Sequence, residues 1–183
     1  MRYDPIGRLL LTPADPDAPE RVHRLRVLGL GLGLRERPEP AFDAFALRLA
    51  QLAGAPYAMV NFPDEERQFY AGLHTPAPEP ESGRFRDRDH GYCPHVVVRR
   101  RALVLEDVRD FPRFAGNAVV DETGLRSYLG VPLIDRTGIA LGTVCVVDTQ
   151  PRHWGRAGLE TVKSLAVELS ERIRRREGDG GDI

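Results

Sequence analysis

The side chains in this sequence that are best suited to chemistry are two cysteines and a histidine close to the first of them. Cys93 and Cys145 are the only cysteines, and His95 follows Cys93 after one proline. Two thiols carry out redox chemistry when one is a nucleophilic thiolate and the other resolves the product. In a cytosolic chain, two thiols are more often reduced and buried, and these two lack the paired spacing of a zinc site. We therefore favour structural thiols and keep a redox pair as an alternative.

His95 is the most versatile polar candidate, because an imidazole donates, accepts or binds a metal near neutral pH. One interpretation places it against a ligand. The interpretation we favour is structural, with His95 tying a short helix to a backbone carbonyl or to Asp107. Further polar residues follow at Asp110, Arg113 and Asn117. Asp and Asn side chains bind nearby backbone amides in turns, which predicts that this group holds a loop in place.

Hydrophobic periodicity predicts helices towards both ends of the chain. Apolar residues at spacings of three and four indicate helices over residues 19–28, 40–54 and 156–177, and a shorter helix is expected over 93–98. A sheet covers only part of such helices, and leftover apolar surface commonly marks an interface. We therefore expect a homodimer through the first and last helices. The apolar residues that motivate this expectation are Val22, Leu25, Leu28, Leu159, Val162, Leu165, Leu169 and Ile173.

In the second helix, the predicted apolar stripe consists of Phe42, Phe45, Leu49 and Leu52. Strands are expected between the helices, where β-branched and aromatic stretches are separated by turn residues. These strands cover residues 57–62, 67–73, 103–106, 127–134 and 139–147. The segment 75–89 is rich in proline and charge and is expected to be a surface loop. Strands joined mostly by hairpins, with helices at both ends, predict an α/β fold of the α+β type with an antiparallel sheet.

Four sequence blocks occur in an order that is characteristic of one family. They read Y-C-P-H at 92–95, D-V-R-D-F-P-R-F-A-G-N at 107–117, Y-L-G-V-P-L at 128–133 and G-T-V-C-V-V-D at 142–148. Together with D-E-E-R-Q-F at 64–69, they resemble a bacterial variant of the GAF domain, a small sensor module. The resemblance points towards ligand sensing and away from catalysis.

The resemblance implies a single domain over residues 19–177. Pro5, Pro13 and Pro16 predict an irregular arm over 1–18, and a disordered tail is expected over 178–183. A central sheet of five or six antiparallel strands would carry the N- and C-terminal helices on one face. A ligand pocket would lie on the other face, under a roof of loops and short helices at 92–98 and 111–120.

The floor of this implied pocket would come from alternate residues of the strand over 139–147. Leu141, Thr143, Cys145 and Val147 share one face of a regular strand, and the polar character of Thr143 and Cys145 makes their face the expected floor. The residues expected to bind the ligand are Cys93, His95, Asp107, Phe114, Tyr128, Thr143 and Cys145.

The resemblance implies a stand-alone sensor or regulatory domain that binds a small molecule or a partner protein and signals in trans as a dimer. We expect no catalytic residue and no metal, and the resemblance names neither a ligand nor a cofactor. A first alternative is a redox enzyme of the free methionine sulfoxide reductase type that uses Cys93 and Cys145. A bilin photoreceptor and a dimerisation scaffold without a ligand are further alternatives.

Composition and charge indicate which partners and which cellular location to expect. The chain has 183 residues and a formal net charge of −1, so an extended nucleic-acid surface is not expected. No apolar run approaches the ~20 residues that span a bilayer, and no signal sequence is recognisable, so we expect no membrane partner and a cytoplasmic location. Lys163 is the only lysine, and a preference for arginine of this kind fits a bacterial source with a G+C-rich genome.

Overall fold

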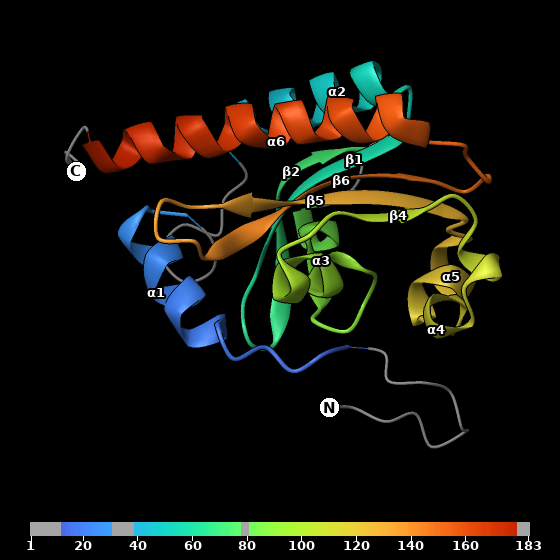
Figure 1. Ribbon diagram of the computed structural model, residues 1–183, viewed down its shortest axis with the longest axis horizontal. Coiled ribbons are helices and arrows are strands. Elements are labelled where there is room, and N and C mark those ends of the chain that lie inside the picture. Colours follow the sequence, from blue (N-terminus) through green and yellow to red (C-terminus); the bar gives the residue numbers. More distant parts are fainter. Residues whose placement is uncertain (1–11, 31–38, 78–80, 179–183) are drawn as a thin grey trace.

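A six-stranded antiparallel sheet forms the centre of the molecule (Figure 1). The computed structural model describes residues 12–30, 39–77 and 81–178. The strand order is β3-β2-β1-β6-β5-β4, so the long hairpins β1–β2 and β5–β6 meet at the middle of the sheet. The strands are β1 (Tyr57–Pro63), β2 (Arg67–His74), β3 (Phe85–Asp87), β4 (Leu103–Leu105), β5 (Ser127–Ile134) and β6 (Ala140–Asp148).

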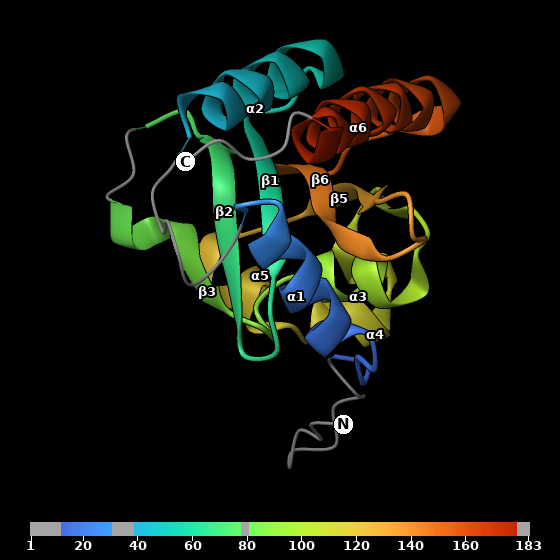
Figure 2. The ribbon, with the colours of Figure 1, turned by 90° about the vertical axis from the view of Figure 1, so that its left-hand side faces the viewer.

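Two long helices cover one face of the sheet and short helices cover the other (Figures 1 and 2). The long pair, α2 (Pro40–Ala53) and α6 (Gly155–Gly178), lies side by side over the sheet. The opposite face carries α3 (Cys93–Arg99), η2 (Val108–Asp110), α4 (Pro112–Ala115) and α5 (Ala118–Thr123). This arrangement confirms the predicted α+β fold. No helix within the described ranges is long and apolar enough to cross a membrane.

The first helix, α1 (Ala18–Val27), lies at one end of the sheet beside the β5–β6 hairpin (Figure 1). Arg21 is buried and donates from Nε to the carbonyl oxygen of Ala140 over 2.7 Å. Arg24 Nε donates to Asp135 Oδ2 over 2.8 Å, in the turn of that hairpin. Charged side chains therefore attach this helix to the sheet. The structure does not describe residues 1–11 of the predicted arm or residues 179–183 of the predicted tail.

The apolar stripe of α6 is buried inside the monomer. Val162, Leu165, Leu169 and Ile173 are each at most 4% exposed, because the helix packs on the sheet and on α2. Leu25 and Leu28 of the first helical segment are buried in the same core. The expectation that these residues form a dimer interface is therefore wrong. Full burial of one such side chain contributes about 1.5–3 kcal/mol to folding, and here that contribution goes to the monomer.

Leu52 departs from the stripe predicted for α2. Phe42, Phe45 and Leu49 are buried, whereas Leu52 is 56% exposed. A helix turns by about 100° per residue, and because Ala46 and Ala50 are also buried, the centre of the buried stripe lies roughly 90° from Leu52. The prediction from spacings of three and four was therefore wrong for Leu52, the last residue of the predicted stripe.

The segment 75–89 contains regular structure that its composition did not predict. A short 3₁₀ turn, η1 (Glu81–Arg84), leads into β3, which pairs antiparallel with β2 at the edge of the sheet. A strand of three residues is too short to show an alternating pattern, and its arginine and aspartate suit an exposed sheet edge. The prediction of a loop over this whole segment is therefore wrong for β3.

An irregularity in β6 changes which face one residue occupies. Leu133 pairs with Gly142 and Ile134 pairs with Ala140, so Leu141 is an extra residue that forms a β-bulge. Leu141 consequently packs in the core beneath the long helices rather than on the face of Cys145. The expectation that Leu141 shares that face assumed a regular strand.

Candidate functional site

A partly enclosed cavity of about 210 Å³ lies on the sheet face opposite α2 and α6. Its floor comes from the central strands, and its roof from the segment before α3 and from α5. The floor residues are Tyr57, Met59, Tyr70, Tyr128, Cys145 and Val147, and the roof residues include His90, Tyr92, Cys93, Val119 and Leu125. The cavity therefore lies on the face of β6 that carries Cys145 and Val147, and Leu141 and Thr143, which were expected on the same floor, are absent from its wall.

Three of the seven residues expected at the ligand line this cavity, namely Cys93, Tyr128 and Cys145. His95, Asp107, Phe114 and Thr143 do not belong to its wall. The cavity is thus centred nearer to β1 and β2 than the sequence suggested.

His95 lies in the core behind the roof. It is 1% exposed, and its ring packs edge-on against Phe114 with 5.1 Å between ring centroids. Two residues of helix rotate a side chain by about 200°, so His95 points away from the side of α3 that presents Cys93 to the cavity. Phe114 itself accepts a hydrogen bond at its carbonyl oxygen from the Tyr92 hydroxyl over 2.8 Å. His95 and Phe114 therefore support the roof from behind.

Thr143 and Asp107 also lie outside the wall. The Thr143 side chain is fully buried in the sheet, opposite Asn61 on β1. Asp107 caps η2 by accepting from Arg109 N over 3.1 Å, and it accepts from Arg126 Nε over 3.0 Å. The hydrogen bond from Arg126 holds the pKa of the Asp107 carboxyl below its ordinary value. Asp107 therefore fixes the entry to the short helices.

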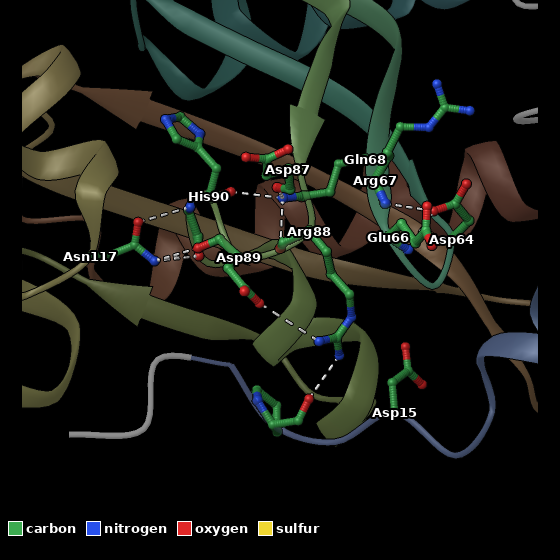
Figure 3. A network of polar contacts seen from close by, with 12 residues as sticks. Asp15, Asp64, Glu66, Arg67, Gln68, Asp87, Arg88, Asp89, His90 and Asn117 are labelled. Carbon is green, nitrogen blue, oxygen red and sulfur yellow. Dashed lines mark hydrogen bonds and ion pairs between the residues drawn. The ribbon is translucent and has the colours of Figure 1, made fainter. Parts of the chain in front are cut away.

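Side-chain amides hold the backbone that leads into the roof (Figure 3). Asn117 Nδ2 donates to the carbonyl oxygens of Asp89 and Gly91 over 3.0 and 3.1 Å. Asn117 Oδ1 accepts from Gly91 N and, as the cap of α5, from Val119 N, both over 3.0 Å. The loop-holding role predicted for Asn117 is therefore confirmed.

Gln68 holds the same backbone from the sheet side (Figure 3). Its Nε2 donates to the carbonyl oxygens of Asp87, Arg88 and His90 over 3.0, 3.0 and 2.7 Å. Its Oε1 accepts from Asn61 Nδ2 over 2.8 Å. Sequence reasoning missed this role, although Gln68 belongs to the D-E-E-R-Q-F block. The cavity residues Tyr57 and Met59 were also missed, and their alternation along β1 was the available signal.

The two thiols meet at the inner wall of the cavity. Cys93 Sγ and Cys145 Sγ are 3.7 Å apart, and the Tyr128 hydroxyl donates to Cys93 Sγ over 3.4 Å. The hydrogen bond from Cys145 lowers the pKa of Cys93 to about 6 against the opposing effect of burial, and Tyr128 acts in the same direction. The hydrogen bond to Cys93 and burial raise the pKa of Cys145, and negative charge on Cys93 adds to this effect. The first proton of the pair is therefore lost easily and the second is retained.

Gly130 explains why the sequence block begins Y-x-G. Gly130 lies opposite Cys145 on β6, and the Tyr128 ring folds over it. A Cβ atom at this position would lie 2.2 Å from the Tyr128 hydroxyl oxygen, far inside contact distance. A side chain at residue 130 would thus displace the hydroxyl that hydrogen-bonds Cys93.

No group of three or more His, Cys, Asp or Glu side chains suited to a metal ion occurs in the described part of the chain.

The known proteins that this chain resembles include one curated relative and the two solved structures described next. A cyclic di-GMP phosphodiesterase of Pseudomonas aeruginosa is 28% identical over 144 residues, which are 76% of this chain but only 23% of that protein. The GAF domain of a phosphoenolpyruvate-protein phosphotransferase from Coxiella burnetii has a TM-score of 0.63 and 18% identity, over 90% of this chain and 98% of that one. A free methionine-R-sulfoxide reductase from Neisseria meningitidis, in complex with its substrate, has a TM-score of 0.61 and 14% identity, over 95% of this chain and 99% of that one.

At such identities the likeness to the solved structures concerns the fold alone. The sequence model of the GAF domain, by contrast, matches residues 37–173, well over half of the chain. That range contains the whole sheet and nearly all of the cavity-bearing face described above. The chain therefore belongs to the GAF domain family.

Proposed function

We propose that this chain is a cytoplasmic GAF sensor domain that binds a small molecule in the cavity and signals its occupancy to a partner protein. The observation that supports this most directly is the cavity of about 210 Å³ with its mainly aromatic and apolar wall. Sites of this kind bind through apolar contact and use a few polar groups to orient the ligand.

The polar groups of the wall favour a ligand with an acceptor or anionic group. Arg86 supplies a guanidinium cation at the cavity, whereas His90 is held by Glu122 Oε2 over 2.9 Å and the Thr123 hydroxyl donates to the carbonyl oxygen of Val119. No carboxylate occurs among the described lining residues. The complementary ligand is therefore a small molecule with an apolar or aromatic body and one such polar group. Cys93, Tyr128 and Cys145 would contact it, while His95, Asp107, Phe114 and Thr143 would support the wall.

Ligand binding is tested by filling the cavity. Thermal-shift screening of small aromatic carboxylates should reveal binders, because a ligand at one hundred times its dissociation constant stabilises the protein by ~2.7 kcal/mol. Met59→Trp should abolish the shift, since Met59 lies in the floor. The matched control is Val27→Trp, an exposed position on α1 outside the cavity wall, which should leave the shift unchanged. Equal shifts in both variants would place the ligand elsewhere, and a screen that stabilises not even the unmodified protein would leave a scaffold as the better interpretation.

We propose a binding role rather than a catalytic one. The phosphodiesterase relative matches over 23% of its length, which gives no ground for assigning its activity to this chain. The reductase shares the fold at 14% identity. Incubation with free methionine sulfoxide and a thiol reductant should therefore yield no methionine. Multiple turnover that disappears in Cys93→Ser would contradict this part of the proposal.

We further propose a homodimer through the outer surface of α2 and α6. Leu47, Leu52 and Val167 are 42%, 56% and 58% exposed on these two neighbouring helices (Figure 2). A specific dimer buries on the order of 1,600 Å² in total, which this pair of helices is long enough to supply. Val167→Glu should shift the mass measured by light scattering from dimer to monomer without loss of folding. A monomeric unmodified protein at tens of micromolar would refute the dimer.

A further inference from the structure

The cavity ends at two thiols that belong to opposite walls. Cys93 begins α3 in the roof, and Cys145 lies on the central strand β6 in the floor. Both side chains are at least 95% buried in protein, yet both belong to the lining of the cavity. We propose that Cys93 and Cys145 form a redox-active pair, which a small hydroperoxide that enters the cavity converts into an intramolecular disulfide. This inference is independent of the ligand proposed above.

The two sulfurs are close enough for this bond. They are 3.7 Å apart and must approach to about 2.05 Å, a movement of about 1.7 Å. The Sγ atom of a cysteine moves farther than this when χ1 changes from one staggered rotamer to the next. Side-chain rotation can therefore cover the distance that separates the two sulfurs.

The surroundings decide which sulfur reacts first. Cys93 receives a hydrogen bond from the Tyr128 hydroxyl, and the pKa of its thiol is lowered to about 6 by Cys145 despite burial. Thr143 and Asn61 act on Cys93 in the same direction, and Thr143 Oγ1 has no other partner among the described residues. The pKa of Cys145 is raised. Cys93 is therefore the attacking thiolate, and Cys145 is the resolving thiol.

The reaction balances with hydroperoxide as the only oxidant. The Cys93 thiolate attacks the terminal peroxide oxygen, the O–O bond breaks, and Cys93 becomes a sulfenic acid while the departing alkoxide or hydroxide takes up the proton that the Cys93 thiol had released. The Cys145 sulfur then attacks the Cys93 sulfur, the S–O bond breaks, and the Cys145 proton leaves with the hydroxide as water. The two sulfurs together lose two electrons, which the peroxide gains. Cellular dithiols reverse the bond by exchange.

The bond would alter the cavity. It joins roof to floor across 52 positions of sequence and pulls α3 towards β6. Because both sulfurs are part of the wall, the cavity loses room at this end and its affinity for a ligand changes. Oxidation would thus act on the same site that the sensor uses for binding.

Hydrogen peroxide treatment of the full chain tests the proposal directly. After unfolding and alkylation, we expect loss of two hydrogens from the intact mass and a disulfide-linked peptide pair containing Cys93 and Cys145. In Cys145→Ser, dimedone should label Cys93, whereas Cys93→Ser should show no label on Cys145. Two fully alkylated thiols after treatment of the unmodified protein would overturn the proposal. So would a disulfide that forms with free methionine sulfoxide but not with hydroperoxides, because that result identifies a reductase.

Tyr128 serves as a positioning residue and gives a second readout. Tyr128→Phe removes the hydroxyl that donates to Cys93, so the midpoint of the pH profile for Cys93 oxidation should move to higher pH. The control is Thr161→Val, which removes a hydroxyl from α6 on the opposite face of the sheet and should leave the midpoint in place. Equal midpoints in both variants would contradict the assignment of Cys93 as the activated thiol. Both variants retain Cys93 and Cys145, so this comparison does not depend on whether the cysteine variants fold.

Discussion

Replacement of Asn117 by alanine should destabilise the domain at the roof of its cavity. The side chain is 2% exposed and makes four hydrogen bonds, one to the amide of Val119 in α5 and three to the backbone of Asp89 and Gly91. Loss of an Asn cap costs about 1 kcal/mol, and each of the other bonds contributes about 1 kcal/mol. The substitution should therefore lower the free energy of unfolding by about 4 kcal/mol, a large share of the ~5–15 kcal/mol typical of a domain.

Urea unfolding followed by circular dichroism measures this loss. With a slope of ~2 kcal/mol/M, the midpoint should fall by about 2 M without a change of slope. Asp64→Ala is the matched control, because Asp64 Oδ1 accepts two backbone hydrogen bonds, from Glu66 and Arg67, in the exposed β1–β2 turn. That variant should lose ~1 kcal/mol or less. If Asn117→Ala costs no more than Asp64→Ala, the assigned role of the Asn117 network is refuted.

A conservative change separates the two halves of the Asn117 network. Asn117→Asp keeps an oxygen that accepts from Gly91 and Val119 but removes the donor to the carbonyl oxygens of Asp89 and Gly91. Its second carboxylate oxygen would face those two carbonyl oxygens in a buried site, so its stability should fall at least as far as that of Asn117→Ala. Amide hydrogen exchange over residues 89–93 should rise in both variants, because this backbone leads directly into the cavity wall.

Three further substitutions test the sheet and its electrostatics. Gly142→Ala should cost about 3 kcal/mol in urea unfolding, because its Cβ would lie 2.1 Å from the Asn61 carbonyl oxygen in a paired strand. Gly130→Ala should displace the Tyr128 hydroxyl and shift the pH midpoint of Cys93 alkylation upwards; an unchanged midpoint would contradict that contact. Burial alone raises the pKa of Asp135, but hydrogen bonds from Thr137, Arg24 and Ile139 bring it below its ordinary value. The stabilisation is therefore present above about pH 4 and lost as pH falls through the folded-state pKa, so Asp135→Asn should weaken acid destabilisation measured by thermal unfolding.

Local pattern was enough to predict most of the secondary structure. The spacing of apolar residues placed α1, α2 and α6, and the turn residues at 135–138 placed the β5–β6 hairpin. These features depend on neighbours in sequence, so a period of two or of 3.6 is visible without knowledge of the rest of the fold. The three-residue strand β3 escaped detection because its stability comes from pairing with β2.

The wall of the cavity was predictable only in part, because it is assembled from strands and loops distant in sequence. Cys145 and Tyr128 were found through sequence blocks, whereas Tyr57 and Met59 enter the wall because β1 pairs with β6. His95 lies in a conspicuous block but was expected on the wrong side of α3, since which side of a short helix faces a cavity depends on what packs behind it.

By itself, the sequence determined the α+β class, the family resemblance, the helices and hairpins, and the presence of two thiols suited to either structure or redox chemistry. Only the tertiary structure decided that the apolar stripe of α6 is buried in the monomer core and that a bulge turns Leu141 away from the cavity. It also decided that Cys93 and Cys145, 52 positions apart, lie within 3.7 Å. The physical reason is that periodicity records which side of an element is apolar. The partner of that side is fixed only when all layers pack together.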